Sequence, residues 1–284
     1  MIETMITDPI TLELIHIPAG EFLMGSDPFK DTMADIDEQP QQHIYVPEFY
    51  IGKFPITNEQ YAVFIKATGH RVPGHWEDGE IPAGKENHPV VCVSWHDAVA
   101  FCQWLSEATG QLFRLPTEAE WEKAARGPDG RIYPWGNEWD KTKLNSDAGG
   151  SRDTTPVGSY SPGGDSPYGV ADMAGNVWEW THGLCRPYPY LADDGREEPQ
   201  ARGSRAVRGG SWFISQWYAR VSYRFIAPPN YFSSLYGFRV SVAPVLSAGI
   251  DRKLGEVNIP FDGQPLPVDD TGDAEFDAAI ELKG

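Results

Sequence analysis

The sequence has few cysteines, and it has no long apolar run. It contains three cysteines in 284 residues, and an odd number without Cys-x-x-Cys spacing argues against a disulfide scaffold or a zinc site. No run approaches the roughly 18 apolar residues that a membrane span requires. The N-terminus lacks the basic start and the unbroken apolar stretch of a secretory signal. We therefore expect no membrane span and a default location in the cytoplasm, with later export left open.

Basic residues are also scarce relative to acidic ones. The chain has 23 Lys and Arg against 41 Asp and Glu, which gives a formal net charge of -18. Such a surface repels phosphate backbones, so we expect no nucleic-acid partner. It attracts cations, and carboxylates are the ligands that hard cations prefer.

Glycine, proline and tryptophan are abundant. The sequence has 29 Gly, 24 Pro and 10 Trp, and 12% of its residues are aromatic. This composition is typical of a loop-rich domain fixed by aromatic side chains and not of a helical bundle. The ordinary 40% hydrophobic and 23% charged content argues against disorder.

Local patterns predict a mixed α+β fold. Residues 12–24 read as a β-hairpin with Pro-Ala-Gly as its turn. Strand-like alternation resumes in the stretch HIYVPEFYIGKF, at 43–54. Capping boxes and closing glycines predict three helices, and short apolar stretches predict three later strands. The helices are expected within 57–69, 94–110 and 117–127, and the strands at 206–212, 219–224 and 237–243.

The last forty residues differ in composition from the rest. We expect one domain over residues 1–244, followed by an acidic, Pro- and Asp-rich extension over 245–284. That extension is interpreted either as a solvated tail or as a strap that lies on the domain.

Eight short motifs occur in a fixed order along the chain. They are IPAGEFLMGS, FPITNEQY, PVVCVSWHDAVAFCQWL, RLPTEAEWEKAARG, YPWGNEW, GNVWEW, VRGGSW and GFRV. In this order the sequence resembles the formylglycine-generating-enzyme family, also called the sulfatase-modifying-factor family, over roughly residues 12–243. The resemblance implies a C-type-lectin-like α+β fold with two or three main helices and few short strands.

The resemblance also provides a test for catalysis. Oxidases of this family hold copper with a pair of cysteines shortly after the GGS motif, because two soft thiolates suit Cu(I). The matching stretch here, Ser211 to Arg224, contains no cysteine. We interpret Cys92 and Cys102 as packing residues and Cys185 as incidental. Copper is therefore not expected, and we predict no catalytic residue.

The resemblance further implies a structural calcium ion near the GNVWEW motif. The family pattern places ligands at the Asp172 side chain, the Gly175 and Val177 carbonyls and the Glu179 side chain. Alternating side-chain and backbone oxygens are what Ca²⁺ takes. The alternative is a capped turn in which Glu179 accepts bonds from backbone amides.

A second calcium site of the family maps to the loop after residue 144. It would use Asn145 and the Ser146 carbonyl, with Asp147 or Asp153 supplying a carboxylate. The following loop departs from the family pattern, so the acidic ligand stays open between these two.

Aromatic residues are concentrated in the segment 213–236. A core role cannot absorb all eight of them, because the pattern around them does not alternate as a strand would. Exposed aromatic side chains are favourable binding anchors, since they bury much area at low rotamer cost. We therefore predict one ligand-binding face, for an unidentified protein or other macromolecule, lined by Phe213, Ile214, Ser215, Trp217, Phe225, Ile226, Tyr231, Phe232, Ser233, Ser234 and Leu235.

The same segment is similar to the variable region of proteins diversified by retroelements, which use this lectin-like fold. The positions between the family motifs of this segment carry residue types that an asparagine codon encodes once its adenines are replaced. Two observations count against diversification: such regions usually end the chain, and some undiversified relatives have similar loops. A set of merely hydrophobic loops is the alternative.

Three functions follow from these observations. The first is a non-catalytic ligand-binding domain that displays the surface 213–236. The second is an oxidase of the formylglycine-generating type, or a related sulfatase-modifying enzyme, with non-cysteine ligands. The third is a structural or regulatory module whose acidic tail docks on a partner. Copper binding with oxidation of a thiol peptide would distinguish the second from the others.

Overall fold

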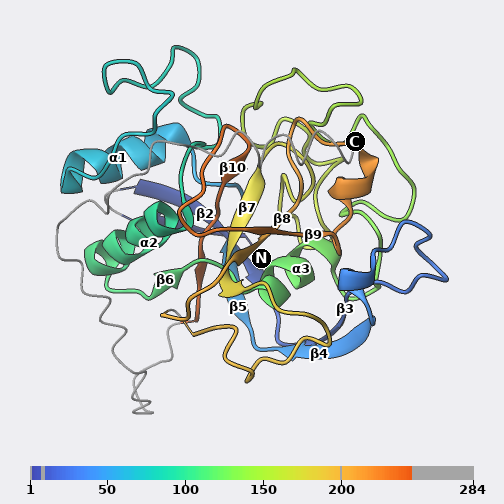
Figure 1. The fold of residues 1–284 in the computed structure, drawn as a ribbon. Helices are drawn as coiled ribbons and strands as arrows, with labels where there is room; N and C mark the ends of the chain where they lie inside the picture. The colour runs from blue at the N-terminus through green and yellow to red at the C-terminus, as the bar shows by residue number, and fades with distance from the viewer. Residues whose placement is uncertain (1, 8–9, 199, 245–284) are drawn as a thin grey trace.

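The computed structural model describes residues 2–7, 10–198 and 200–244. The described part of the chain contains three α-helices, two short 3-10 helices and three small sheets joined by loops (Figure 1), so the fold is α+β as predicted. The predicted extension over 245–284 lies outside the described residues, and the domain boundary at residue 244 stays a prediction.

The largest sheet brings the two ends of the described domain together. Its strand order is β1-β2-β5-β11-β6, and all its neighbours are antiparallel. Ile51 on β5 lies opposite Ile15 on one side and Ser241 on the other. The bounds are β1 Ile2–Thr7, β2 Ile10–Ile17, β5 Phe49–Gly52, β11 Ser241–Val242 and β6 Phe113–Arg114.

Two smaller sheets complete the β structure. The four-stranded sheet has the order β10-β7-β8-β9, and its β10–β7 pair is parallel. Its strands are β10 Tyr236–Gly237, β7 Trp178–Leu184, β8 Arg205–Arg208 and β9 Arg224–Ala227. The third sheet pairs β3 Gly20–Met24 with β4 Gln42–Val46.

The hairpin predicted at 12–24 is wrong. Strand β2 pairs with β1 and β5, whereas β3 pairs with β4 in a different sheet. The Pro18–Ala19 bend therefore redirects the chain between two sheets instead of closing a ladder. Two adjacent apolar runs did not specify which neighbours they pair with, because pairing is decided by later segments.

The three helices lie where the capping signals placed them. They are α1 Asn58–Thr68, α2 Trp95–Thr109 and α3 Glu118–Arg126. Each begins with a complete capping box, at Thr57, Ser94 and Thr117 in turn, which satisfies backbone amides that the helix leaves unpaired. A glycine ends each helix. Helices α1 and α2 pack against each other, and α3 packs on β3, β4, β7 and β8 (Figure 1).

The core has two parts. The first contains the apolar faces of α1 and α2 together with Trp178 and Trp180 of β7. Its rings contact edge to face, for example Phe101 with Phe238 at 5.4 Å between centroids. The second surrounds Trp121 of α3. Residues 127–177 contain no regular helix or strand, so long loops lie over a rigid interior. No helix of the described ranges is long and apolar enough to cross a membrane.

Candidate ligand-binding face

The segment 213–236 starts from a tight turn after β8. Gly210 has a φ of 75°, and a Cβ there would lie 2.8 Å from Ile214 Cδ1 and 3.0 Å from the Tyr218 carbonyl oxygen. Only glycine suits such a position, because it tolerates positive φ and leaves room for the returning chain. The turn therefore seats Ile214 inside the domain and leaves Phe213 outside.

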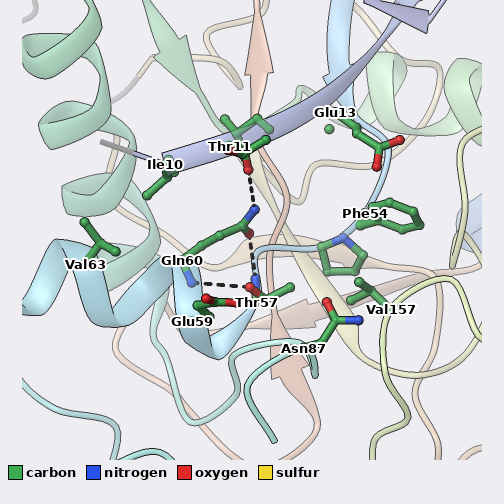
Figure 2. Close-up of a pocket in the computed structure, with 13 residues that line it drawn as sticks. Ile10, Thr11, Glu13, Phe54, Thr57, Glu59, Gln60, Val63, Asn87 and Val157 are labelled. Carbon is green, nitrogen blue, oxygen red and sulfur yellow. Dashed lines mark hydrogen bonds between the residues drawn. The ribbon is translucent and has the colours of Figure 1, made fainter. Parts of the chain in front are cut away.

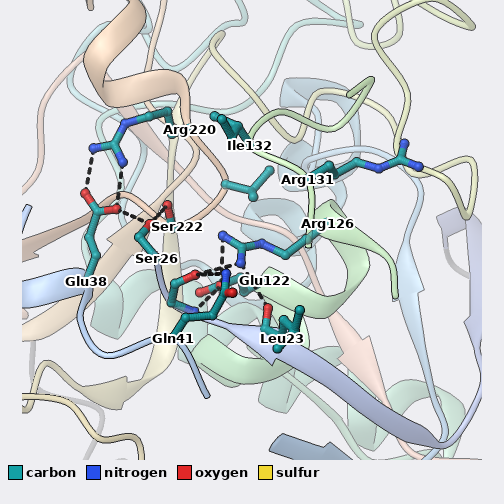
Figure 3. A network of polar contacts seen from close by, with 12 residues as sticks. Leu23, Ser26, Glu38, Gln41, Glu122, Arg126, Arg131, Ile132, Arg220 and Ser222 are labelled. Carbon is teal, nitrogen blue, oxygen red and sulfur yellow. Dashed lines mark hydrogen bonds and ion pairs between the residues drawn. The ribbon is translucent and has the colours of Figure 1, made fainter. Parts of the chain in front are cut away.

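Buried ion pairs join the segment 213–236 to the loop between β3 and β4 (Figure 3). Figure 3 shows Arg220 facing Glu38, and Arg220 Nη2 lies 2.6 Å from Glu38 Oε1. The same guanidinium contacts Asp31, because its Nη1 lies 2.8 Å from Asp31 Oδ2. Burial opposes the charge of this guanidinium, but the two carboxylates outweigh burial and raise the pKa of Arg220. Because these acids belong to the loop between β3 and β4, the ion pairs join that loop to the turn at Gln216–Ala219.

A second guanidinium fixes β9. Arg224 Nη2 lies 2.7 Å from Glu118 Oε2 at the start of α3, and its Nε bonds the other oxygen at 2.8 Å. Arg208 of the neighbouring strand contacts Glu118 and also Glu122. Burial opposes the charge of Glu118, yet the guanidinium groups of Arg224 and Arg208 lower its pKa. The backbone under the face is therefore held in one position by charge-assisted hydrogen bonds.

Two large aromatic side chains of the segment stand in solvent. Phe213 is 46% exposed and Trp217 is 41% exposed. Elsewhere in the segment Ser215, Phe225, Phe232 and Ser233 are half-buried, and Ser234 is exposed. We call these seven residues the aromatic face: Phe213, Ser215, Trp217, Phe225, Phe232, Ser233 and Ser234.

Two tryptophans connect the members of the aromatic face. The Trp212 ring contacts Phe213 at 5.5 Å between centroids, and its Nε1 donates to the Ser234 carbonyl at 3.4 Å. Trp178 contacts Phe225 at 5.8 Å between centroids. The face therefore rests directly on rings of the first core.

Three residues predicted for the face are buried instead. Ile214, Tyr231 and Leu235 belong to the first core cluster, with at most 8% of each residue exposed. Tyr231 packs edge to face on Tyr236 at 5.1 Å between centroids. Their apolar side chains fill the interior under the loops, so these three assignments are corrected.

Ile226 is exposed, but it lies on the other side of β9. Phe225 lies opposite Val207 in the ladder, and Ile226 lies opposite Ala206. Successive residues of a strand point to opposite faces of the sheet. Phe225 therefore shares a face with the first core, whereas Ile226 shares one with Arg224. The prediction of one face containing both residues is corrected.

A basic group borders the aromatic face near Phe232. The Arg71 guanidinium carbon lies 4.7 Å from the Phe232 ring centroid, and Arg71 Nη2 lies 2.5 Å from Asp97 Oδ2. The other Asp97 oxygen is 2.8 Å from His70 Nε2. Although burial opposes ionisation of Asp97, the bond to His70 and the charge of Arg71 hold its pKa well below the usual range. Phe232 is therefore fixed by a cation–π contact with an anchored cation.

Sequence reasoning missed two exposed apolar side chains on a neighbouring loop. Phe29 is 96% exposed and Ile36 is 83% exposed. They belong to the loop that Asp31 and Glu38 tie to Arg220, and the sequence analysis left this loop without a role. The sequence feature that could have identified them is the presence of two large apolar residues in an acidic stretch that has neither helical nor strand periodicity.

The first predicted calcium site contains a carboxylate that is already paired. Both oxygens of Glu179 lie 2.6 Å from nitrogens of Arg239, and one accepts a bond from Trp121 Nε1. The Gly175 carbonyl accepts from the Val177 amide. A calcium ion at Glu179 would have to share that carboxylate with the guanidinium, so this residue fits poorly.

The carboxylate of Asp172 is a better candidate for a calcium ligand. Its Oδ2 accepts a bond from the Gly158 amide at 2.7 Å. Burial raises the pKa of Asp172 to about 6, and the nearby charge of Glu179 adds to the effect. A bound cation would stabilise this ionised carboxylate, which the surroundings otherwise disfavour.

The second predicted calcium site has two converging oxygens. A Cβ built on Gly150 would lie 2.2 Å from Asn145 Oδ1 and 2.5 Å from the Ser146 carbonyl oxygen. Asp153 is less available, because its Oδ2 lies 2.7 Å from Lys85 Nζ. Both oxygens already accept hydrogen bonds, because the Gly150 amide donates to the Ser146 carbonyl at 2.8 Å and the Ser151 amide donates to Asn145 Oδ1 at 3.4 Å. A cation here would have to share Asn145 and Ser146 with these amides, and Asp147 is the carboxylate that no ion pair occupies among the described residues. Calcium binding at either place stays a prediction.

The three cysteines do not form a copper site of the expected kind. All three are free thiols, and Cys102 is buried in the first core. Burial raises the pKa of both Cys92 and Cys185 to about 11. Thiolates are the copper ligands, and burial makes the thiolate form less favourable at both positions. The residues present therefore do not fit copper as the family's oxidases hold it.

Sequence comparisons place the chain near enzymes and near an inactive relative. A family model described as "Sulfatase-modifying factor enzyme 1-like domain" matches residues 4–244. The chain is 32% identical to the formylglycine-generating enzyme of Thermomonospora curvata, with 82% of this chain and 94% of that protein covered. It is 30% identical to the mouse "Inactive C-alpha-formylglycine-generating enzyme 2", with 80% and 84% covered.

Structural comparisons agree with the predicted fold. PvdO from Pseudomonas aeruginosa superposes with a TM-score of 0.70 at 28% identity, covering 86% of this chain and 98% of that one. Treponema denticola variable protein 1 gives a TM-score of 0.70 at 23% identity, covering 86% and 99%. These likenesses establish the C-type-lectin-like fold of the formylglycine-generating-enzyme type.

Proposed function

Since the chain belongs to the sulfatase-modifying-factor family, we propose that it is a non-catalytic member that binds a protein or another macromolecule through its aromatic face. The observation that carries the proposal is the exposure of Phe213 and Trp217 on a backbone fixed by buried ion pairs. Aromatic anchors on a rigid support lose little conformational entropy on binding.

A catalytic function is the alternative, and the identity to formylglycine-generating enzymes over most of their length favours it. An oxidase would need copper ligands other than a cysteine pair. The test is a Cu(I) titration followed by incubation of the loaded protein with a cysteine-containing peptide and oxygen. We expect no stoichiometric Cu(I) binding and no aldehyde product. Turnover of the peptide would contradict the proposal.

The binding role is tested with paired substitutions. We expect Phe213→Ser with Trp217→Ser to remove the partners that the wild-type chain retains from a lysate of its host, as measured by quantitative mass spectrometry. The control is Leu112→Ser with Leu191→Ser, which removes two exposed apolar side chains outside the face. Equal loss of partners in both double variants would contradict a specific face.

We extend the proposal to diversification of the aromatic face by a retroelement. Exposed positions such as Phe213, Trp217 and Ser234 can accept many residue types, whereas buried Ile214 and Leu235 cannot vary freely. The neighbouring DNA should therefore contain a near-copy of the region that differs at adenines, beside a reverse-transcriptase gene. A flanking region without such a repeat would contradict diversification and leave the binding role standing.

We also propose that a calcium ion stabilises the loops around Asp172 and Asn145. Support comes from the raised pKa of Asp172 and from the closeness of Asn145 Oδ1 and the Ser146 carbonyl, which both lie against Gly150. Calcium at 100 times its dissociation constant would add about 2.7 kcal/mol to stability. We expect calcium to raise the melting temperature, reversibly with chelator, and to do so less in Asp172→Asn and Asn145→Ala. A melt that is the same in calcium and in chelator would contradict the proposal.

A further inference from the structure

A cavity of about 560 Å³ lies between β2, the start of α1 and three loops. Figure 2 shows side chains from these elements around one space, with Glu13 and Phe54 on one side and Val63 and Glu59 on the other. None of the lining residues belongs to the aromatic face. Its size falls within the range of ordinary small-molecule sites, about 300–1,000 Å³.

The charged side chains that line the cavity are all acidic. They are Glu13 and Glu59. Glu59 is exposed, and its carboxylate has no hydrogen bond or ion pair within the described ranges. Glu13 Oε2 is paired with Lys53 Nζ at 3.0 Å, so Glu59 carries the charge of the cavity that no cation balances, in a chain of net charge -18. The cavity therefore favours a cation.

The start of α1 does not reverse this preference. Backbone amides at a helix N-terminus attract anions when they are free. Here the Asn58 amide donates to the His88 carbonyl, and the Glu59 amide donates to the Glu86 carbonyl, each at 3.0 Å. The Thr57 amide donates to Gln60 Oε1 at 2.9 Å. The amides are occupied, so carboxylates dominate the polar side of the cavity.

The remaining wall is apolar and fixed. Ile10, Val63, Val157 and Phe54 contribute it. Gln60 stiffens the arrangement, because its Nε2 donates to the Thr11 carbonyl at 2.8 Å across the gap between α1 and β2 (Figure 2). An aliphatic chain can contact these side chains while its charged end meets Glu59.

We propose that this cavity binds an alkylammonium group, that is, a primary ammonium on a short aliphatic chain. The ammonium would pair with Glu59, the acid without an ion pair, and the chain would lie against Val63 and Val157. A free alkylamine and the lysine side chain of a peptide share this chemistry. The site is separate from the aromatic face, so its test does not depend on the proposed function.

The test compares three six-carbon probes by calorimetric titration of the full chain at low salt. Hexylamine should bind at least tenfold more tightly than hexan-1-ol or hexanoate, and 0.5 M NaCl should weaken its binding. Glu59→Gln should raise its Kd about three- to fivefold, as expected for a partly exposed ion pair. The matched control Glu80→Gln, an exposed acid outside the cavity, should leave Kd unchanged.

Two further measurements complete the test. Asn87→Trp, at an exposed lining position, should fill the cavity and abolish hexylamine binding while the fold is retained. N-acetyl-lysinamide distinguishes the sources: tighter binding than hexylamine supports a peptide lysine, and weaker binding supports a free amine. Equal Kd values for the three six-carbon probes, or hexylamine binding that Glu59→Gln and Asn87→Trp leave unchanged, would overturn the proposal.

Discussion

Individual buried charges decide how this loop-rich chain stays rigid. Arg208, Arg220, Arg224 and Arg239 are all buried, and each pairs with a buried carboxylate from a distant segment. These partners cannot be predicted from local sequence, since each pair joins residues far apart in the chain. Long loops have few ladder hydrogen bonds, so charge-assisted bonds take over part of that role.

Removing one of these guanidinium groups should be costly. Arg220→Met leaves the carboxylate of Glu38 buried without its cation, and we expect a loss of about 3–5 kcal/mol in the free energy of unfolding. Arg131→Met is the matched control, because Arg131 pairs with the half-exposed Asp129 near the surface. It should cost about 1 kcal/mol or less. Urea unfolding measures both, and equal losses would contradict the structural role of Arg220.

Asp172 should make stability depend on pH. Burial raises its pKa in the folded chain to about 6, above the ordinary 3.8 of the unfolded chain. The folded state therefore binds the proton more tightly, and this contribution to stability is present below about pH 4 and is lost as pH rises through about 6. Asp172→Asn keeps an acceptor for the Gly158 amide and carries no charge.

We expect Asp172→Asn to be more stable than the wild type at pH 8 by about 1–2 kcal/mol in chelator, and the gain to shrink at pH 5. Urea unfolding at the two pH values measures the difference. A gain that is the same at both values would show that ionisation of Asp172 is not its cause.

At the scale of elements, local signals predicted all three helices but only some of the strands. The stretch 43–54 contains most of β4 and all of β5, as predicted, whereas the strand predicted at 219–224 is wrong, because the turn at Gln216–Ala219 ends there and β9 begins only at Arg224. The capping boxes at Thr57, Ser94 and Thr117 and the closing glycines are complete within a few residues, so the sequence alone located α1, α2 and α3. Strand pairing is non-local, which is why the hairpin at 12–24 was wrong. The same limit explains the face: exposure of Phe213 and burial of Ile214 depend on a turn whose other wall comes from Tyr218.

The turn at Gly210 connects the fold to the aromatic face. Gly210→Ala would force a Cβ to within 3.0 Å of Ile214 and of the Tyr218 carbonyl at a positive φ. We expect it to lower the free energy of unfolding by about 1–3 kcal/mol. Gly74→Ala is the control, because no atom lies within 4 Å of its added Cβ, and it should change stability by less than about 0.5 kcal/mol. Thermal melts of both variants decide the matter, and a neutral Gly210→Ala would contradict the described turn.

At the scale of the whole molecule, the chain has the fold of its family, and its proposed binding role depends on the residues of its surface loops. The ends of the described domain meet in one sheet through β2, β5 and β11, and both cores lie beneath the loops. Motif order in the sequence was enough to predict this scaffold. It could not predict the alkylammonium cavity, because β2, α1 and the loops at Asn87 and Val157 meet only in the folded chain.

The central claim is that the aromatic face binds a macromolecule. The most direct measurement replaces Phe213 with the photo-crosslinking residue p-benzoylphenylalanine and irradiates the full chain in a lysate of its host. The same substitution at Leu112, an exposed apolar position elsewhere, serves as the control. We predict one discrete set of crosslinked partners from position 213 that is missing from position 112. Indistinguishable crosslinks from the two positions would contradict the account.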